Sequence, residues 1–225
     1  MVCSAGFPVT AESAETVIYA NDFETSAGSE WALTNRDTTP SGRTFLGRFV
    51  NDTQLSLSLG QGSPIYSAGL PAHDSLTISF NLFMIKSWDG NFGPDLWTLG
   101  VEGGPTLLHA TFSNPLHSVD TPQSYPDAYG VGVHPAQTGA AEIDSLGYSA
   151  NFGDSVYALS FTFPHSADSV KLWFVAEGFT GTPLPPGLDD ESWGLDNVTV
   201  TVIPEPATLL LLALGGAALV RRRRT

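Results

Sequence analysis

The sequence is poor in cysteine and in positive charge. Its 225 residues include one cysteine, Cys3, so no disulfide can form within the chain. Only 9 residues are Lys or Arg, against 23 Asp or Glu. Residues 204–225 contain four of the basic residues and one acid, which leaves residues 1–203 with 5 basic and 22 acidic residues and a net charge of −17. A surface this acidic repels nucleic acid and anionic lipid, so we expect no nucleic-acid partner.

The sequence also lacks the common signatures of hydrolases. Neither G-x-S-x-G nor H-E-x-x-H occurs. No two histidines stand at i and i+4, the spacing that chelates zinc from one helix face; the five are His73, His109, His117, His134 and His165. We therefore expect a protein that is not an enzyme. A glycan-active hydrolase is the less favoured alternative, because two acids distant in sequence can still meet in space.

Convincing helical periodicity is absent from residues 16–203, and strict alternation of apolar and polar residues is the dominant pattern. In the run 169–176, for example, Val170, Leu172 and Phe174 lie opposite Lys171 and Trp173. Similar alternation marks the runs 53–60, 75–85, 156–163 and 194–202, with turns rich in Gly and Pro between them. Short strands with one apolar face each predict an all-β domain of two packed antiparallel sheets over residues 16–203. Residues 1–15 are small and polar, and we expect them to be disordered.

The last residues, "VIPEPATLLLLALGGAALVRRRRT", differ from everything before them. The apolar run 207–220 has 14 residues and ends in four arginines. A helix of that length rises about 21 Å, which is short of the roughly 30 Å of a bilayer core. The adjacent arginines nevertheless indicate a stop-transfer signal, with Arg221, Arg222, Arg223 and Arg224 retained in the cytoplasm. We expect residues 204–225 to form a hydrophobic helix that anchors the chain in a membrane.

This tail resembles the PEP-CTERM sorting signal. Pro204, Glu205 and Pro206 match its motif, residues 207–220 its hydrophobic part and Arg221–Arg224 its basic end. The resemblance implies a Gram-negative bacterium, export, and recognition by an exosortase-type membrane protease. The anchored precursor is then released to the cell envelope or the extracellular polymer matrix. Residues 1–16 contain no apolar signal core, so we expect the true start of the protein to lie upstream.

The ends of the body resemble a lectin-like jelly roll of the kind found in carbohydrate-binding modules. "YANDFET" stands at the first expected strand and "SWGLDNVTV" at the last. The resemblance implies a jelly-roll sandwich in which these two strands lie together, with an acidic residue from each holding a structural Ca²⁺. By position, those residues are Glu24, with Asp22, and Asp196.

A second, weaker calcium site is indicated by the stretch "SWDGNFGPD". It offers Asp89, Asn91 and Asp95 as oxygen ligands, and its glycines allow the loop to curl, although the spacing is not that of an EF-hand. A plain Gly/Pro turn is the alternative.

Aromatic residues beside polar loops suggest a platform for sugar rings. The candidates are Trp88, Trp97 and Trp193, followed by Tyr125 and Tyr129. Packing of the same side chains in the core is the alternative. We therefore expect an exported protein whose body binds or organises polysaccharide. A matrix protein without a ligand is the second hypothesis, and the exposure of the three tryptophans distinguishes the two.

Overall fold

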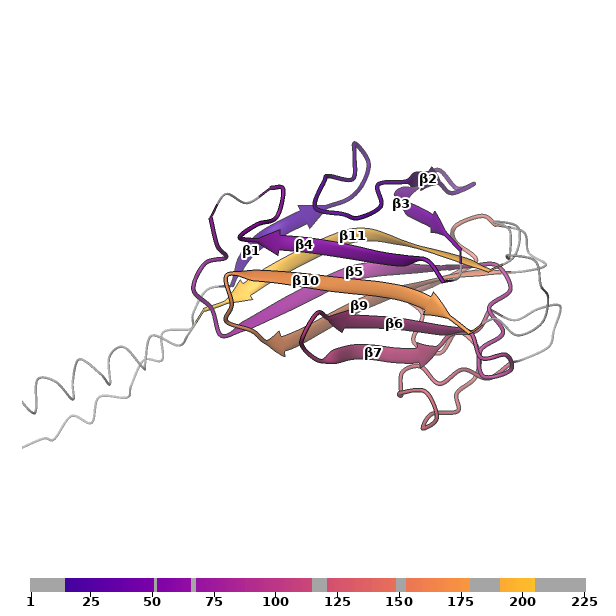
Figure 1. The fold of residues 1–225 in the computed structure, drawn as a ribbon. Helices are drawn as coiled ribbons and strands as arrows, with labels where there is room; N and C mark the ends of the chain where they lie inside the picture. Colours follow the sequence, from indigo (N-terminus) through magenta and orange to yellow (C-terminus); the bar gives the residue numbers. More distant parts are fainter. Residues whose placement is uncertain are drawn as a thin grey trace, which may run out of the picture.

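The computed structural model describes residues 15–50, 52–65, 68–114, 121–148, 153–178 and 191–204. These residues form two antiparallel β-sheets that lie face to face (Figure 1). The prediction of an all-β fold built from two sheets is confirmed. No helix among the described residues is long and apolar enough to cross a membrane. The predicted C-terminal helix falls on residues 205–225, outside the described residues, as do residues 1–14.

The larger sheet follows the order β2–β3–β11–β5–β9–β8, and β1 also pairs with β11. Its strands are β1 (Thr16–Asn21), β2 (Arg36–Thr38), β3 (Thr44–Phe49), β5 (Ser75–Ile85), β8 (Glu142–Ile143), β9 (Asp154–Pro164) and β11 (Ser192–Ile203). The smaller sheet follows the order β4–β10–β6–β7. Its strands are β4 (Gln54–Gly60), β6 (Leu96–Val101), β7 (Thr106–Thr111) and β10 (Ser169–Glu177).

The first and last strands lie together, as the sequence led us to expect. Thr16 pairs with Val202 and Asn21 with Val198 in antiparallel register. The pairing of β11 with β5 shifts between Asp196 and Thr199, and Asn197 adopts a positive φ of 52° at this bulge. The bulge places Asp196 and the turn after β1 next to each other at the edge of β11.

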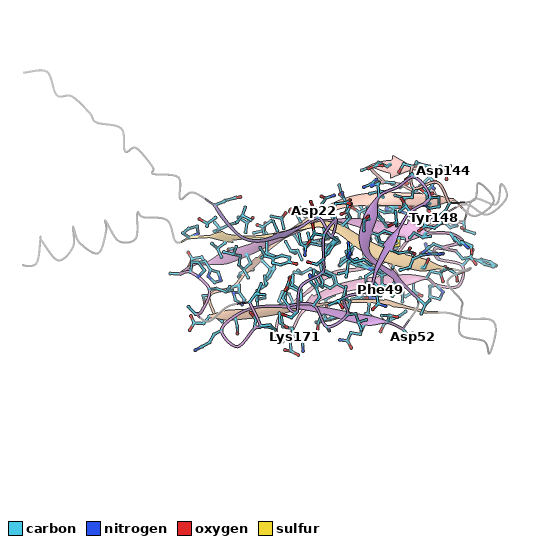
Figure 2. All side chains as sticks on the ribbon, turned by 90° about the horizontal axis from the view of Figure 1, so that it is seen from above. Asp22, Phe49, Asp52, Asp144, Tyr148 and Lys171 are labelled. Carbon is cyan, nitrogen blue, oxygen red and sulfur yellow. The ribbon has the colours of Figure 1, made fainter. Side chains whose placement is uncertain are left out.

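The core fills the space between the sheets, as Figure 2 shows from above. Alternation sends one face of each strand inward, so Leu55, Leu57 and Leu59 of β4 are all fully buried. They pack with the inward faces of β5, β9, β10 and β11 in one cluster. Lys171 and Asp144 lie on opposite outer sides in Figure 2. The outer face of the larger sheet also buries a second apolar cluster, made of Phe45, Phe83, Ile85, Leu146 and Val156.

A long irregular segment after β7 is held to the larger sheet by a buried polar network centred on Gln123. Its Oε1 accepts hydrogen bonds from Ser113 N, Gln137 N and Tyr157 Oη at 3.0–3.1 Å. Its Nε2 donates to the carbonyls of Tyr125 and Thr138 at 3.1 and 3.0 Å. All donors and acceptors of this buried amide are therefore used, which fixes a loop that alternation alone could not place.

Candidate functional site

The three tryptophans predicted to stack on sugars are buried in the core. Trp88, Trp97 and Trp193 have no exposed surface. The indoles of Trp97 and Trp193 meet edge to face at 5.8 Å, and Trp88 Nε1 donates to Ser192 O at 3.0 Å. Each indole buries a large apolar area between the sheets. This burial stabilises the fold more than an exposed position on a binding surface would. The prediction that these three bind a ligand is wrong, and core packing is their role.

A different tryptophan, the half-buried Trp173, points outward from the sandwich. It lies on β10, where the inward neighbours Leu172 and Phe174 are fully buried. Its partner across the sheet is Gly100 of β6. A methyl group at Gly100 would stand 2.3–2.8 Å from three atoms of the indole ring, so the ring lies across this glycine. The missing side chain at residue 100 leaves room for an indole on the outer face of the smaller sheet, which faces the viewer in Figure 1.

Polar side chains surround the indole on the outer face of the smaller sheet. Ser56 of β4 pairs with Trp173, and Ser58 with Lys171, so both serines share its face. On the other side, Thr98 Oγ1 and His109 Nδ1 are 2.9 Å apart. Tyr129 is 42 % exposed and packs edge to face against the His109 ring at 5.9 Å. The face therefore offers aromatic rings together with hydroxyls and an imidazole.

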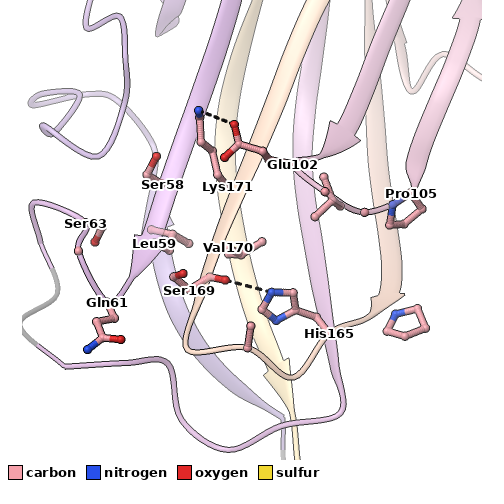
Figure 3. Close-up of a pocket in the computed structure, with 16 residues that line it drawn as sticks. Ser58, Leu59, Gln61, Ser63, Glu102, Pro105, His165, Ser169, Val170 and Lys171 are labelled. Carbon is pink, nitrogen blue, oxygen red and sulfur yellow. Dashed lines mark hydrogen bonds and ion pairs between the residues drawn. The ribbon is translucent and has the colours of Figure 1, made fainter.

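An open groove of about 530 Å³ continues this face at one end (Figure 3). Its walls come from the turn after β4, the β6–β7 turn and the β9–β10 turn, and include Gln61 and His165. Lys171 Nζ and Glu102 Oε1 form an ion pair at 2.8 Å on its rim. Lys171 and Ser58 belong both to the face and to the groove, so the two surfaces are continuous.

The first predicted calcium site is only partly assembled. Asp196 is buried, and burial, together with the charges of Glu24 and Asp22, raises its pKa to about 6, although Asn197 N–H and Arg43 oppose this. Arg43 Nη2 lies 3.7 Å from Asp196 Oδ2. The structure thus brings the three acids near one another, as predicted, and also places an arginine beside Asp196. Glu24 and Asp22 are exposed. Their role as calcium ligands stays a prediction.

The second predicted site gains a ligand that the sequence did not indicate. Oxygen atoms of Asp89, Asp95 and Glu191 all lie within 4.8 Å of one another, and the last two residues are buried. The register of β11 on β5, where Ser192 faces Ile85, brings Glu191 to this loop. Asn91 is directed elsewhere, since its Oδ1 accepts from Thr111 Oγ1 and its Nδ2 donates to Gly132 O. Asn91 therefore ties two loops together, and its role as a ligand of this cluster stays a prediction.

Solved structures similar to the chain show low identity. Dimeric latent PorU from Porphyromonas gingivalis aligns at 11 % identity and a TM-score of 0.47, over 88 % of this chain and 13 % of that one. The C-terminal CBM6 of the laminarinase LamC from Zobellia galactanivorans aligns at 13 % identity and a TM-score of 0.32, over 84 % and 98 %. A structure of infectious bursal disease virus, Gx strain, aligns at 13 % identity and a TM-score of 0.33, over 90 % of this chain and 37 % of that one. No curated protein matches the chain. At such TM-scores, the role of the body has to be argued from its own residues.

The tail matches a family model. Residues 202–224 match the PEP-CTERM protein-sorting motif. This confirms the sorting signal expected from Pro204, Glu205, Pro206 and the arginines; only Val202, Ile203 and Pro204 of it lie among the described residues. The motif implies export of a membrane-associated precursor that an exosortase processes. The chain therefore carries a PEP-CTERM protein-sorting motif behind a two-sheet β body.

Proposed function

We propose that this protein is exported, anchored in the inner membrane by residues 204–225, and released by an exosortase-type protease to the cell envelope or extracellular matrix. There its jelly-roll body binds polysaccharide and carries out no catalysis. The sorting motif supports the route of the protein, and the outer face of the smaller sheet supports the role of the body.

The observation that carries polysaccharide binding is the position of Trp173. An indole held across a glycine on an exposed sheet face presents an apolar plane, which suits the flat face of a pyranose ring. Ser56 stands directly across from it, and Ser58 and His109 lie on the same face as further hydrogen-bond partners for sugar hydroxyls. The continuous groove has the volume of an ordinary small-ligand site, with a Lys–Glu pair at its rim. An extended polysaccharide could therefore lie on the indole of Trp173 and continue into the groove.

Binding of cell-surface polysaccharide to the full-length protein tests the proposal, with a panel of neutral and acidic glycans as probes. Trp173→Ala should weaken binding about 3- to 10-fold, the value of one aromatic contact, while Trp173→Phe should retain part of it. Phe92→Ala is the matched control, because Phe92 is 81 % exposed but lies in the loop between β5 and β6, neither on a strand of the smaller sheet nor on the groove wall. Equal binding by the parent and Trp173→Ala would contradict the proposed site, and absence of binding to every glycan would favour a matrix protein without a ligand.

We also propose a structural Ca²⁺ at Asp89, Asp95 and Glu191. Three carboxylates meeting at one loop are hard oxygen ligands of the kind that Ca²⁺ takes, and backbone carbonyls and water can complete its shell. The ion would fix the loop of residues 89–95 to the start of β11. Glu24, Asp22 and Asp196 remain the alternative site.

Thermal melts of the full-length protein in Ca²⁺ and in EDTA test this part. Because only the folded chain assembles the site, Ca²⁺ at a hundredfold excess over Kd should add about 2.7 kcal/mol. For a protein of this size, that is about 5–10 °C in Tm. Asp95→Asn should abolish the difference and Asp196→Asn should leave it. The opposite pattern would show that the ion binds at Asp196 instead. Equal Tm values of the parent in both buffers would show that neither site binds a stabilising Ca²⁺.

A further inference from the structure

Two histidines meet at the end of the sandwich where β11 leads into the sorting motif. His73 precedes β5 and is buried, and His165 follows β9 on the wall of the groove (Figure 3). Their ring atoms Nε2 of His73 and Nδ1 of His165 are 2.7 Å apart. The ring planes differ by 13° and the centroids are 5.0 Å apart. A nitrogen contact this short is closer than stacked rings allow, so the two imidazoles meet edge to edge with the nitrogens facing each other.

The outer nitrogen of each ring faces a carbonyl oxygen. His73 Nδ1 contacts Pro71 O at 2.5 Å, and His165 Nε2 contacts Ser169 O at 3.2 Å. A carbonyl can only accept, so each of these nitrogens carries a proton. The contact between the rings needs a third proton, because two bare lone pairs at 2.7 Å would repel. Two neutral imidazoles carry only two protons in total.

From this count we infer that His73 and His165 hold one extra proton between them and form a buried imidazole–imidazolium pair with a single positive charge. The short separation agrees with a charge-assisted N–H···N hydrogen bond. In this state all four ring nitrogens are satisfied. Loss of the shared proton removes one hydrogen bond, and the one to Ser169 is the longest of the three. A second extra proton would force two N–H groups to face each other.

The pair joins two segments beside the exit of the sorting motif. His165 N donates to Asp74 O at 2.9 Å, and Asp74 N donates to Ile203 O at 3.0 Å. The ring contact therefore continues a backbone ladder that ends one residue before Pro204. Opening the pair would loosen the connection before β5 from the β9–β10 turn. The pair is thus an acid-sensitive clasp at the end from which the chain is anchored and released.

The clasp opens in acid, when a second extra proton is added to the pair, and it weakens in alkali, when the shared proton is lost. Burial, and next the charge of His73, lower the pKa of His165. A histidine whose pKa is lowered by folding contributes stability above its unfolded value, near 6.5, and loses it as the pH falls toward the folded value. The other charged groups around the pair are Asp74 on its own segment, Asp168 on the β9–β10 turn, and the Lys171–Glu102 pair across the groove.

The first test counts protons directly by ¹⁵N NMR of the histidine rings in the full-length protein at pH 7. We expect protonated nitrogens at His73 Nδ1 and His165 Nε2, and a third proton shared between the rings. Two neutral rings, with two protons in total, would overturn the inference. So would deprotonated facing nitrogens that shift together on addition of Zn²⁺, since a metal ion would then take the place of the proton.

The second test is hydrogen exchange at pH 7.5 and pH 5.0, corrected for the intrinsic effect of pH. Protection of residues 68–74 and 165–169 should fall about tenfold or more at the lower pH. His165→Gln should lose that pH dependence, and the matched variant His134→Gln should keep it, because His134 pairs with Asp127 on a different loop. Equal pH dependence in the parent and His165→Gln would overturn the clasp, whatever the stability of the variant.

Discussion

Replacing the buried amide of Gln123 by an apolar side chain, in Gln123→Leu, should destabilise the candidate site far more than the same exchange at an exposed glutamine. Gln123 has no exposed surface, and its side chain makes five hydrogen bonds. In Gln123→Leu, two backbone N–H groups, two carbonyls and the hydroxyl of Tyr157 lose that partner. Four of these groups belong to the irregular segment after β7 that carries Tyr129 to the outer face of the smaller sheet, and the fifth, Tyr157, lies on β9. The change therefore reaches the ligand face without touching it.

The loss of stability depends on how many of these buried polar groups are left without a hydrogen-bond partner. A buried donor or acceptor without a partner costs about 1–3 kcal/mol. The two N–H groups, of Ser113 and Gln137, are the least able to reach another acceptor, and together they would cost about 2–6 kcal/mol. We therefore expect about 4 kcal/mol of destabilisation, near the upper end of single substitutions. In Tm this is about 8–16 °C for a protein of this size.

Chemical and thermal unfolding of the full-length protein measure this prediction. Gln54→Leu is the matched control, since Gln54 is exposed on β4 and the same exchange there should change stability by less than about 0.5 kcal/mol. Gln123→Glu should also destabilise the protein, because its second carboxyl oxygen would face the carbonyls of Tyr125 and Thr138 in place of the two N–H donors. A Gln123→Leu variant as stable as Gln54→Leu would refute the claim that this network fixes the loop.

Three further predictions concern charge, packing and sorting. In EDTA, Asp196→Asn should melt about 2–4 °C above the parent at pH 7.5 and match it only near pH 3.5. A carboxyl whose folded pKa is raised to about 6 stabilises the fold fully below its unfolded pKa and loses that contribution as the pH rises through 6, so a lower Tm of the variant at pH 7.5 would contradict this. Gly100→Ala should displace the indole of Trp173 and weaken glycan binding at little cost in Tm, so unchanged binding would count against the platform. Serine in place of Arg221–Arg224 should abolish retention and processing of the precursor in cell fractions, while normal processing would exclude a stop-transfer role.

Most strands were predictable because their alternation marks one buried face. The alternation in residues 75–85 reproduces β5 (Ser75–Ile85) at both ends, although Phe83 and Ile85 on its other face are buried as well. Asp89 and Asp95 were also within reach of sequence reasoning, because one short loop brings them together. Glu191 was not. It comes from a segment about a hundred residues away, and only the register of β11 on β5 shows that it joins them.

The tryptophans illustrate the limit of local sequence reasoning. Trp88 and Trp193 stand beside acidic turns, which suggested exposure, but the need to fill the space between two sheets buries both. Alternation did place Trp173 on the outward face of its strand. The additional signal was Gly100, and it becomes visible only when β6 is known to pair with β10. Cross-strand partners of this kind cannot be derived from one strand alone.

Quenching of tryptophan fluorescence by acrylamide, with and without a bound polysaccharide, tests the central claim most directly. Of the five tryptophans, Trp31, Trp88, Trp97 and Trp193 are at most 3 % exposed, so a water-soluble quencher reaches chiefly Trp173. If polysaccharide lies on the outer face of the smaller sheet, saturation with it should sharply reduce quenching of the full-length protein and leave the weak quenching of Trp173→Phe unchanged. Binding that leaves the accessibility of Trp173 unaltered would place the polysaccharide elsewhere and contradict the account.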